Sequence, residues 1–100
     1  MQSILLASES QIKLNVIKEI FPINEYEITC INCDCLQLPA QPINCTEQCA
    51  KARLNYIKQS TFPKDYDYYI SIENGIEIDD EEDDEEILPL DVCVAFIEHK

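Results

Sequence analysis

Four polar side chains, in two segments of this sequence, are candidates for binding phosphate groups. Ser8, Ser10 and Lys13 follow the apolar run Ile4–Ala7, and Arg53 lies further along among apolar residues. Hydroxyl, ammonium and guanidinium groups all donate hydrogen bonds to phosphate oxygens. A serine turn before a helix is also the usual N-cap, and an arginine on an apolar stripe also pairs with a carboxylate. Both interpretations stay open for these residues.

A strand followed by a helix is expected to position the first three of these side chains. Ile4–Ala7 is apolar without alternation, as in a strand buried on both faces. From Ile12 the apolar residues recur at helical spacing, with Ile12, Val16 and Ile20 on one stripe and Ile17 and Phe21 beside it. The serine turn then lies at the carboxyl end of the strand, where backbone N–H groups of a helix N-terminus can meet an anion.

The remaining elements complete an expected α/β domain of two helices and about four strands in a mixed sheet. Asn44, followed by Glu47, resembles a capping box, so the second helix should begin there and run to about Ser60. Its inward stripe holds Cys49, Ala50, Arg53, Leu54 and Ile57. The other expected segments are a strand with a bulge over 27–35, a proline-bearing connector over 38–42, a strand over 68–78 and a last strand over 92–97.

The stretch around Asn74-Gly75 allows two topologies. An Asn-Gly pair between strand-like segments is a strong signal for a two-residue hairpin. The alternative is one strand that continues past Gly75. We favour the continuous strand, because the eight consecutive acids over 79–86 need a solvated loop and Val92–Ile97 offers an antiparallel partner beyond it. A magnesium or calcium site is the sharper alternative for the acidic loop, although contiguous acids lack the spacing of a calcium site.

Composition sets further limits. One hundred residues make a single domain, and a net charge of −13 with seven basic residues argues against nucleic-acid binding. No signal peptide or membrane span is recognisable, so a cytoplasmic protein is expected. Six cysteines could suggest a zinc cluster, but their spacing matches no standard ligand pattern, and reduced thiols that pack as small apolar residues are the better interpretation.

Several segments resemble the inosine/xanthosine triphosphatase family. The first runs from Leu6 to Ile17, where family members carry Ala-Ser/Thr-x-Asn-x-x-Lys after the first strand. Gln41-Pro42, the helix segment 46–53 and the strand segment 67–77 follow in the order of the family. The resemblance covers nearly all of this chain but about the first three-fifths of a typical family member.

The resemblance implies hydrolysis of inosine and xanthosine triphosphate with Mg²⁺ or Mn²⁺. Ser8, Ser10, Lys13 and Arg53 would bind phosphate in such an enzyme. Glu73 would be the catalytic carboxylate, and it would bind the metal ion together with Asp65 or Asp67. The second lobe of the family fold is missing from this chain, and the edge left exposed would favour association, for example as a homodimer.

The sequence departs from the family pattern at positions that matter for activity. The first motif lacks its asparagine, and Cys49-Ala50-Lys51-Ala52-Arg53 stands where family members have Gly-Ala-x-Asn-Arg. A cysteine, Cys35, aligns with the family's second acidic metal position. The alternative function is therefore a catalytically inactive relative that acts as a nucleotide-binding or protein-interaction module.

Overall fold

The computed structural model describes residues 1–60, 64–78 and 89–100. In chain order the elements are β1 (Gln2–Leu6), α1 (Gln11–Ile20), β2 (Tyr26–Cys30), a short 3-10 helix (Asp34–Leu36), α2 (Thr46–Ser60), β3 (Tyr68–Glu77) and β4 (Leu90–His99). The strands form one mixed sheet with two helices packed on it, which confirms the predicted α/β class. The predicted acidic loop over 79–86 lies outside the described residues.

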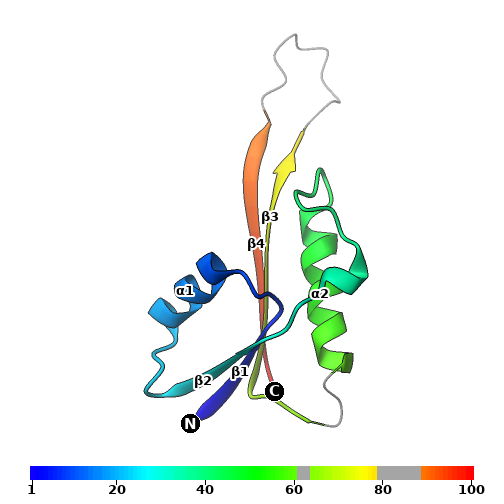
Figure 1. The fold of residues 1–100 in the computed structure, drawn as a ribbon. Helices are drawn as coiled ribbons and strands as arrows, with labels where there is room; N and C mark the ends of the chain where they lie inside the picture. Colours follow the sequence, from blue (N-terminus) through cyan, green and yellow to red (C-terminus); the bar gives the residue numbers. More distant parts are fainter. Residues whose placement is uncertain (61–63, 79–88) are drawn as a thin grey trace.

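The sheet has the strand order β2-β1-β3-β4. β1 runs parallel to β2 and to β3, whereas β3 and β4 are antiparallel. Figure 1 shows α1 and α2 on opposite faces of the sheet, so the connections that follow β1 and β2 cross it on different sides. In open α/β sheets, the carboxyl end of the strand where the connections diverge is the place where ligands bind. Here that position is the end of β1.

β1 forms the centre of the core. Ile4, Leu5 and Leu6 are fully buried, as the unalternating apolar run predicted. Successive side chains point to opposite faces, so Leu5 packs with residues of α2, and Ile4 and Leu6 pack with Ile17 of α1. The predicted inward stripe of α2 is confirmed, because Cys49, Ala50, Leu54 and Ile57 are all buried.

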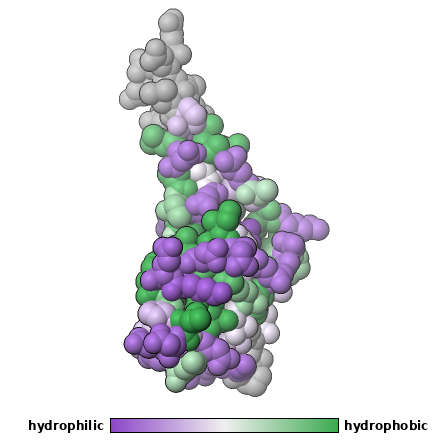
Figure 2. All heavy atoms as spheres, turned by 60° about the vertical axis from the view of Figure 1, so that its left-hand side comes forward, coloured by the Kyte–Doolittle hydropathy of each residue, from purple (hydrophilic) through white to green (hydrophobic). Residues whose placement is uncertain are grey.

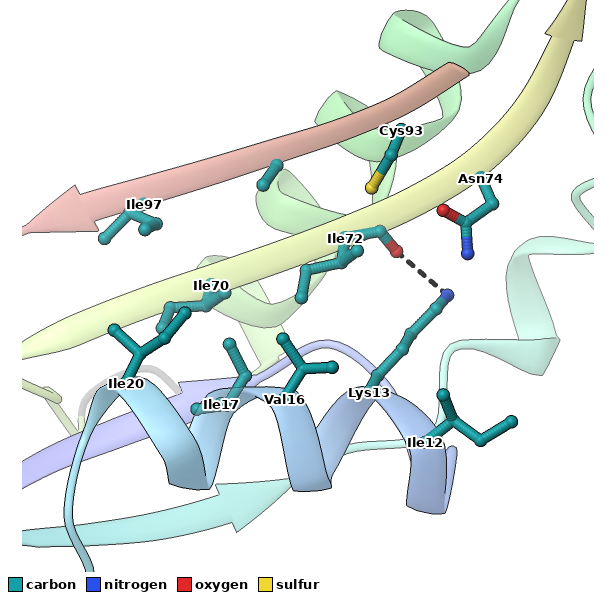
Figure 3. Close-up of a pocket in the computed structure, with 11 residues that line it drawn as sticks. Ile12, Lys13, Val16, Ile17, Ile20, Ile70, Ile72, Asn74, Cys93 and Ile97 are labelled. Atoms are coloured by element: carbon teal, nitrogen blue, oxygen red, sulfur yellow. Dashed lines mark hydrogen bonds between the residues drawn. The ribbon is translucent and has the colours of Figure 1, made fainter. Parts of the chain in front are cut away.

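The predicted apolar stripe of α1 does not enter the core. Ile12, Val16 and Ile20 remain 78%, 45% and 62% exposed, and Ile17 is the one residue of the helix that is buried. The stripe instead lines an apolar groove of about 260 Å³ between α1 and the β3–β4 pair. Figure 3 shows this groove, and hydrophobic side chains are also visible among hydrophilic ones in Figure 2.

The second strand is shorter than the predicted 27–35 segment. β2 ends at Cys30 because Asn32 starts a local turn, in which its side-chain oxygen accepts a hydrogen bond from the Asp34 N–H at 2.6 Å. Such side chain to backbone bonds compete with strand pairing. Cys33 then points into the core, with 3% of its surface exposed.

The predicted cap at Asn44 is also wrong. Asn44 adopts a left-handed φ of 55°, and its side chain bonds to both backbone groups of Ile78. α2 begins two residues later, at Thr46. The connector before the helix is thereby tied to the end of β3.

The predicted continuous strand at Gly75 is confirmed and the two-residue hairpin is excluded. β3 pairs with β4 without interruption from Tyr68↔His99 to Glu77↔Leu90. Gly75 is required for packing, because a Cβ there would lie 2.0 Å from Thr46 Oγ1 and 2.7 Å from the Pro42 carbonyl oxygen. The start of α2 therefore lies directly against β3.

β2 and β4 are the edge strands of the sheet. An unpaired edge can pair with another chain. Association as a homodimer stays a prediction. Among the residues that the structure describes, no helix has the length and apolar character needed to cross a membrane.

Candidate functional site

A polar pocket of about 290 Å³ lies at the carboxyl ends of β1 and β2. Its lining includes all four residues that the sequence predicted to bind phosphate: Ser8, Ser10, Lys13 and Arg53. Three segments meet here, namely the turn after β1, the first turn of α1 and the middle of α2. The chain therefore brings two hydroxyls and two cations to one side of the divergence point of the sheet.

Both serines shape the turn before α1. Ser10 is the N-cap, and its hydroxyl accepts a hydrogen bond from the Lys13 N–H at 3.4 Å. Ser8 Oγ accepts a bond from the Ser10 N–H at 3.0 Å. The N-cap interpretation is thus confirmed for Ser10. Each hydroxyl keeps its own hydrogen, which it can still donate to an anion.

Lys13 reaches the strand edge that β1 leaves open. β1 pairs with β3 only as far as Ile70, and the Lys13 ammonium donates a hydrogen bond of 2.9 Å to the carbonyl oxygen of Ile72. Figure 3 shows the side chain extended along this path. Lys13 lines both the polar pocket and the apolar groove.

Arg53 of α2 forms an ion pair with Glu73 of β3. The Arg53 Nε donates to Glu73 Oε2 at 2.6 Å, and the two side chains are 17% and 3% exposed. Burial alone would lower the pKa of Arg53, but the hydrogen bond and the negative charge of Glu73 raise it above its ordinary value. The guanidinium therefore stays charged. The carboxylate partner that the sequence allowed for Arg53 is Glu73.

Sequence reasoning missed part of the pocket wall. Asn32, Cys33 and Asp34 line it from the turn after β2, and Glu9 lines it from the turn after β1. Burial raises the pKa of the Cys33 thiol, an effect that the charge of Arg53 opposes. The signal for this wall was present in the sequence, because residues that follow two parallel strands meet at one edge of the sheet. The predicted bulged strand over 27–35 concealed it.

The other two predicted metal ligands lie elsewhere. Asp67 Oδ2 accepts a hydrogen bond of 2.7 Å from the Ser3 N–H, and Asp65 forms an ion pair of 3.1 Å with Lys100. Both aspartates sit before β3, and Glu73 follows Asp67 by six residues, or roughly 20 Å along a strand. The predicted grouping of Asp65 or Asp67 with Glu73 at one metal ion is therefore a misassignment.

The described residues contain no group of three or more histidine, cysteine or acidic side chains arranged to hold a metal ion by themselves. Mg²⁺ commonly uses one or two carboxylates together with the phosphates of a substrate. The pocket wall offers Asp34 and Glu9 for that purpose. Binding of a metal ion at this pocket stays a prediction.

The comparisons with known proteins bear on the fold. No protein-family model and no curated protein sequence matches this chain. The structure is similar to the crystal structure of protein VC0702 from Vibrio cholerae, with a TM-score of 0.58 and 26% sequence identity over 96% of this chain. The match spans 64% of the VC0702 chain. The resemblance to the triphosphatase family stays a prediction.

Proposed function

We propose that this chain binds the phosphate groups of a purine nucleoside triphosphate in the polar pocket and hydrolyses inosine or xanthosine triphosphate with a divalent metal ion. One observation carries the proposal. Four side chains that were selected for phosphate chemistry from two distant segments line a single pocket at the divergence point of the sheet. The hydrolysis, the metal ion and the identity of the base rest on the sequence resemblance alone.

Phosphate binding would use groups that the structure already orients. The hydroxyls of Ser8 and Ser10 would donate to phosphate oxygens, with the positive end of the α1 dipole behind them. Lys13 would exchange the Ile72 carbonyl for a charged acceptor, and charged hydrogen bonds are the stronger kind. Arg53 would offer the rest of its planar fork to the phosphate.

Glu73 has two roles in this proposal. Its buried carboxylate fixes the orientation of Arg53, as the 2.6 Å hydrogen bond indicates. When a phosphate engages the guanidinium, the carboxylate would become free to accept the proton of the attacking water as a general base. A bound Mg²⁺ would supply charge neutralisation on the phosphates, and Asp34 and Glu9 are the side chains that would hold it.

A specific observation favours nucleotide binding without turnover as the second candidate. Asp65 and Asp67 are occupied at the opposite end of β3, and Glu73 is 3% exposed and paired with Arg53. A protein with this arrangement could hold a triphosphate and leave it intact.

Calorimetric titration of inosine triphosphate in the presence of Mg²⁺ tests the binding step. Lys13→Gln should weaken binding at least tenfold, or by about 1.4 kcal/mol. Lys18→Gln is the matched control, because Lys18 is an exposed lysine of the same helix that does not line the pocket. Equal affinities for wild type and Lys13→Gln would contradict the proposal, as would a wild type that binds no nucleotide.

A further inference from the structure

Two cysteines meet at the first turn of α2. Cys45 precedes the helix and Cys49 lies within it, and their Sγ atoms are 3.8 Å apart. All six cysteines lie in the described ranges and all are free thiols, and this is the one pair among them whose sulfur atoms are in hydrogen-bond contact. We propose that Cys45 and Cys49 are a redox-active dithiol that closes to a disulfide across this turn.

The Cα spacing of the pair falls within the range of a disulfide. The Cys49 N–H donates to the Cys45 carbonyl oxygen at 3.0 Å, so the two residues are one helical turn apart. That spacing corresponds to a Cα–Cα distance of about 6.2 Å. Disulfides form with Cα atoms up to about 6.8 Å apart. The Cβ atoms of residues four apart on a helix are about 5–6 Å apart, whereas those of a disulfide are about 3.5–4.5 Å apart. Closure therefore needs side-chain rotation together with a small backbone shift at Cys45, which precedes the helix.

The oxidant in this proposal is a small-molecule disulfide such as oxidised glutathione. The Cys45 thiolate attacks one sulfur of the oxidant, which forms a mixed disulfide and releases one thiolate. The Cys49 thiolate then attacks the Cys45 sulfur, which forms the intramolecular bond and releases the second thiolate. Overall, two protein thiols are oxidised, and one disulfide is reduced to two small thiols.

The two cysteines differ in the way that this sequence of steps requires. Cys45 is partly exposed and can meet the oxidant, whereas Cys49 is 5% exposed and can be reached only from within the protein. Burial is the largest cause that raises the pKa of the Cys49 thiol, and the hydrogen bond with Cys45 raises it further. Closure by Cys49 is therefore the slower step, and it should accelerate as the pH rises.

The proposed disulfide lies on the same helix as Arg53, one of the residues that line the polar pocket. Cys49 lies one helical turn before Arg53, on the same inward stripe, and it is close enough to Glu73 to feel its charge. The disulfide would therefore form directly beside the Arg53–Glu73 pair. This inference rests on the cysteine geometry and does not depend on nucleotide binding.

The test uses the folded, full-length protein equilibrated with mixtures of reduced and oxidised glutathione. Free thiols are blocked with an alkylating agent, and the chain is cleaved after glutamate residues. Glu47 lies between the two cysteines, so cleavage separates the segment 28–47 from the segment 48–73, in which Cys49 is the single cysteine. The two segments stay joined only through a disulfide. The joined species is then measured by mass spectrometry.

We expect the joined species in the wild type and in the control Cys35→Ser, which removes an exposed thiol from the same preceding segment. Cys45→Ser should reduce it at least tenfold, and circular dichroism of that variant should match the wild type. The proposal is overturned if the joined species persists in Cys45→Ser. It is also overturned if Cys49 stays unlinked in the wild type while the exposed Cys35 and Cys93 form mixed disulfides with glutathione.

Discussion

Replacing Glu73 with glutamine should destabilise the fold far more than an ordinary surface substitution. The Glu73 side chain is 3% exposed and its partner Arg53 is 17% exposed, so the pair is largely removed from water. Glu73→Gln leaves the mostly buried Arg53 guanidinium without a countercharge. Loss of one partner of a buried pair costs about 3–5 kcal/mol, and the residual exposure of Arg53 favours the lower end of this range. For a domain whose total stability is about 5–15 kcal/mol, that is a large share.

The assay is urea unfolding, with Glu98→Gln as the matched control. Glu98 pairs with Lys58 at the same 2.6 Å, but the two side chains are 44% and 40% exposed. An exposed pair contributes about 0–1 kcal/mol, so this control should lose little. If Glu73→Gln and Glu98→Gln lower the free energy of unfolding equally, burial does not govern the Arg53–Glu73 interaction and our reasoning is refuted.

Three further predictions concern the fold. Gly75→Ala should lower the free energy of unfolding by at least about 1–3 kcal/mol in urea, because the new methyl group collides with Thr46 and Pro42. The control Asn74→Ala, at the exposed neighbouring position, should leave that free energy nearly unchanged. Ile17→Ala should cost about 2–5 kcal/mol and Ile12→Ala less than about 0.5 kcal/mol, and similar losses would contradict the burial difference between them. The hydrogen bond from the Ser3 N–H lowers the pKa of Asp67, so this carboxylate stabilises the fold above its unfolded pKa, and that contribution disappears as the pH falls through the folded value. Asp67→Asn should therefore be less stable than the wild type near pH 7, and the difference in stability should shrink below about pH 4. Urea titrations at several pH values measure this difference. A difference that does not depend on pH would contradict its assignment to the Asp67 carboxylate.

Local patterns predicted most of the fold. Ile4–Ala7 specified the central strand because a run with no alternation is compatible with burial on both faces, and all four residues are buried. The helical spacing of the apolar residues in α2 identified the stripe that faces the core. The continuous strand past Gly75 was also predicted, whereas the close contact of Gly75 with Thr46 appears only in the structure.

The errors arose where tertiary contacts decide between local alternatives. Asn44 has the residue type of a helix cap, yet the Ile78 backbone lies close enough to bind its side chain. The stripe of Ile12, Val16 and Ile20 has the spacing of a core face, but its burial depends on what covers the groove. Periodicity reports which residues share a face and cannot report what lies opposite.

The candidate site was predictable in part. Ser8, Ser10 and Lys13 were expected at the carboxyl end of the first strand, and the family resemblance added Arg53; the structure brings all four to one pocket. The error in the metal ligands has a geometric cause. Residues that are close in sequence along an extended strand such as β3 lie far apart in space. Asp67 lies at the amino end of that strand, and Glu73 lies beyond the end of its pairing with β1.

Phosphate release from inosine triphosphate in the presence of Mg²⁺ tests the proposed activity most directly. The wild type should release phosphate, and Lys13→Gln should do so at least tenfold more slowly at limiting substrate, while Lys18→Gln should match the wild type. A wild type that binds the nucleotide without releasing phosphate, or a Lys13→Gln variant as fast as the wild type, would contradict the proposal that this pocket hydrolyses triphosphates.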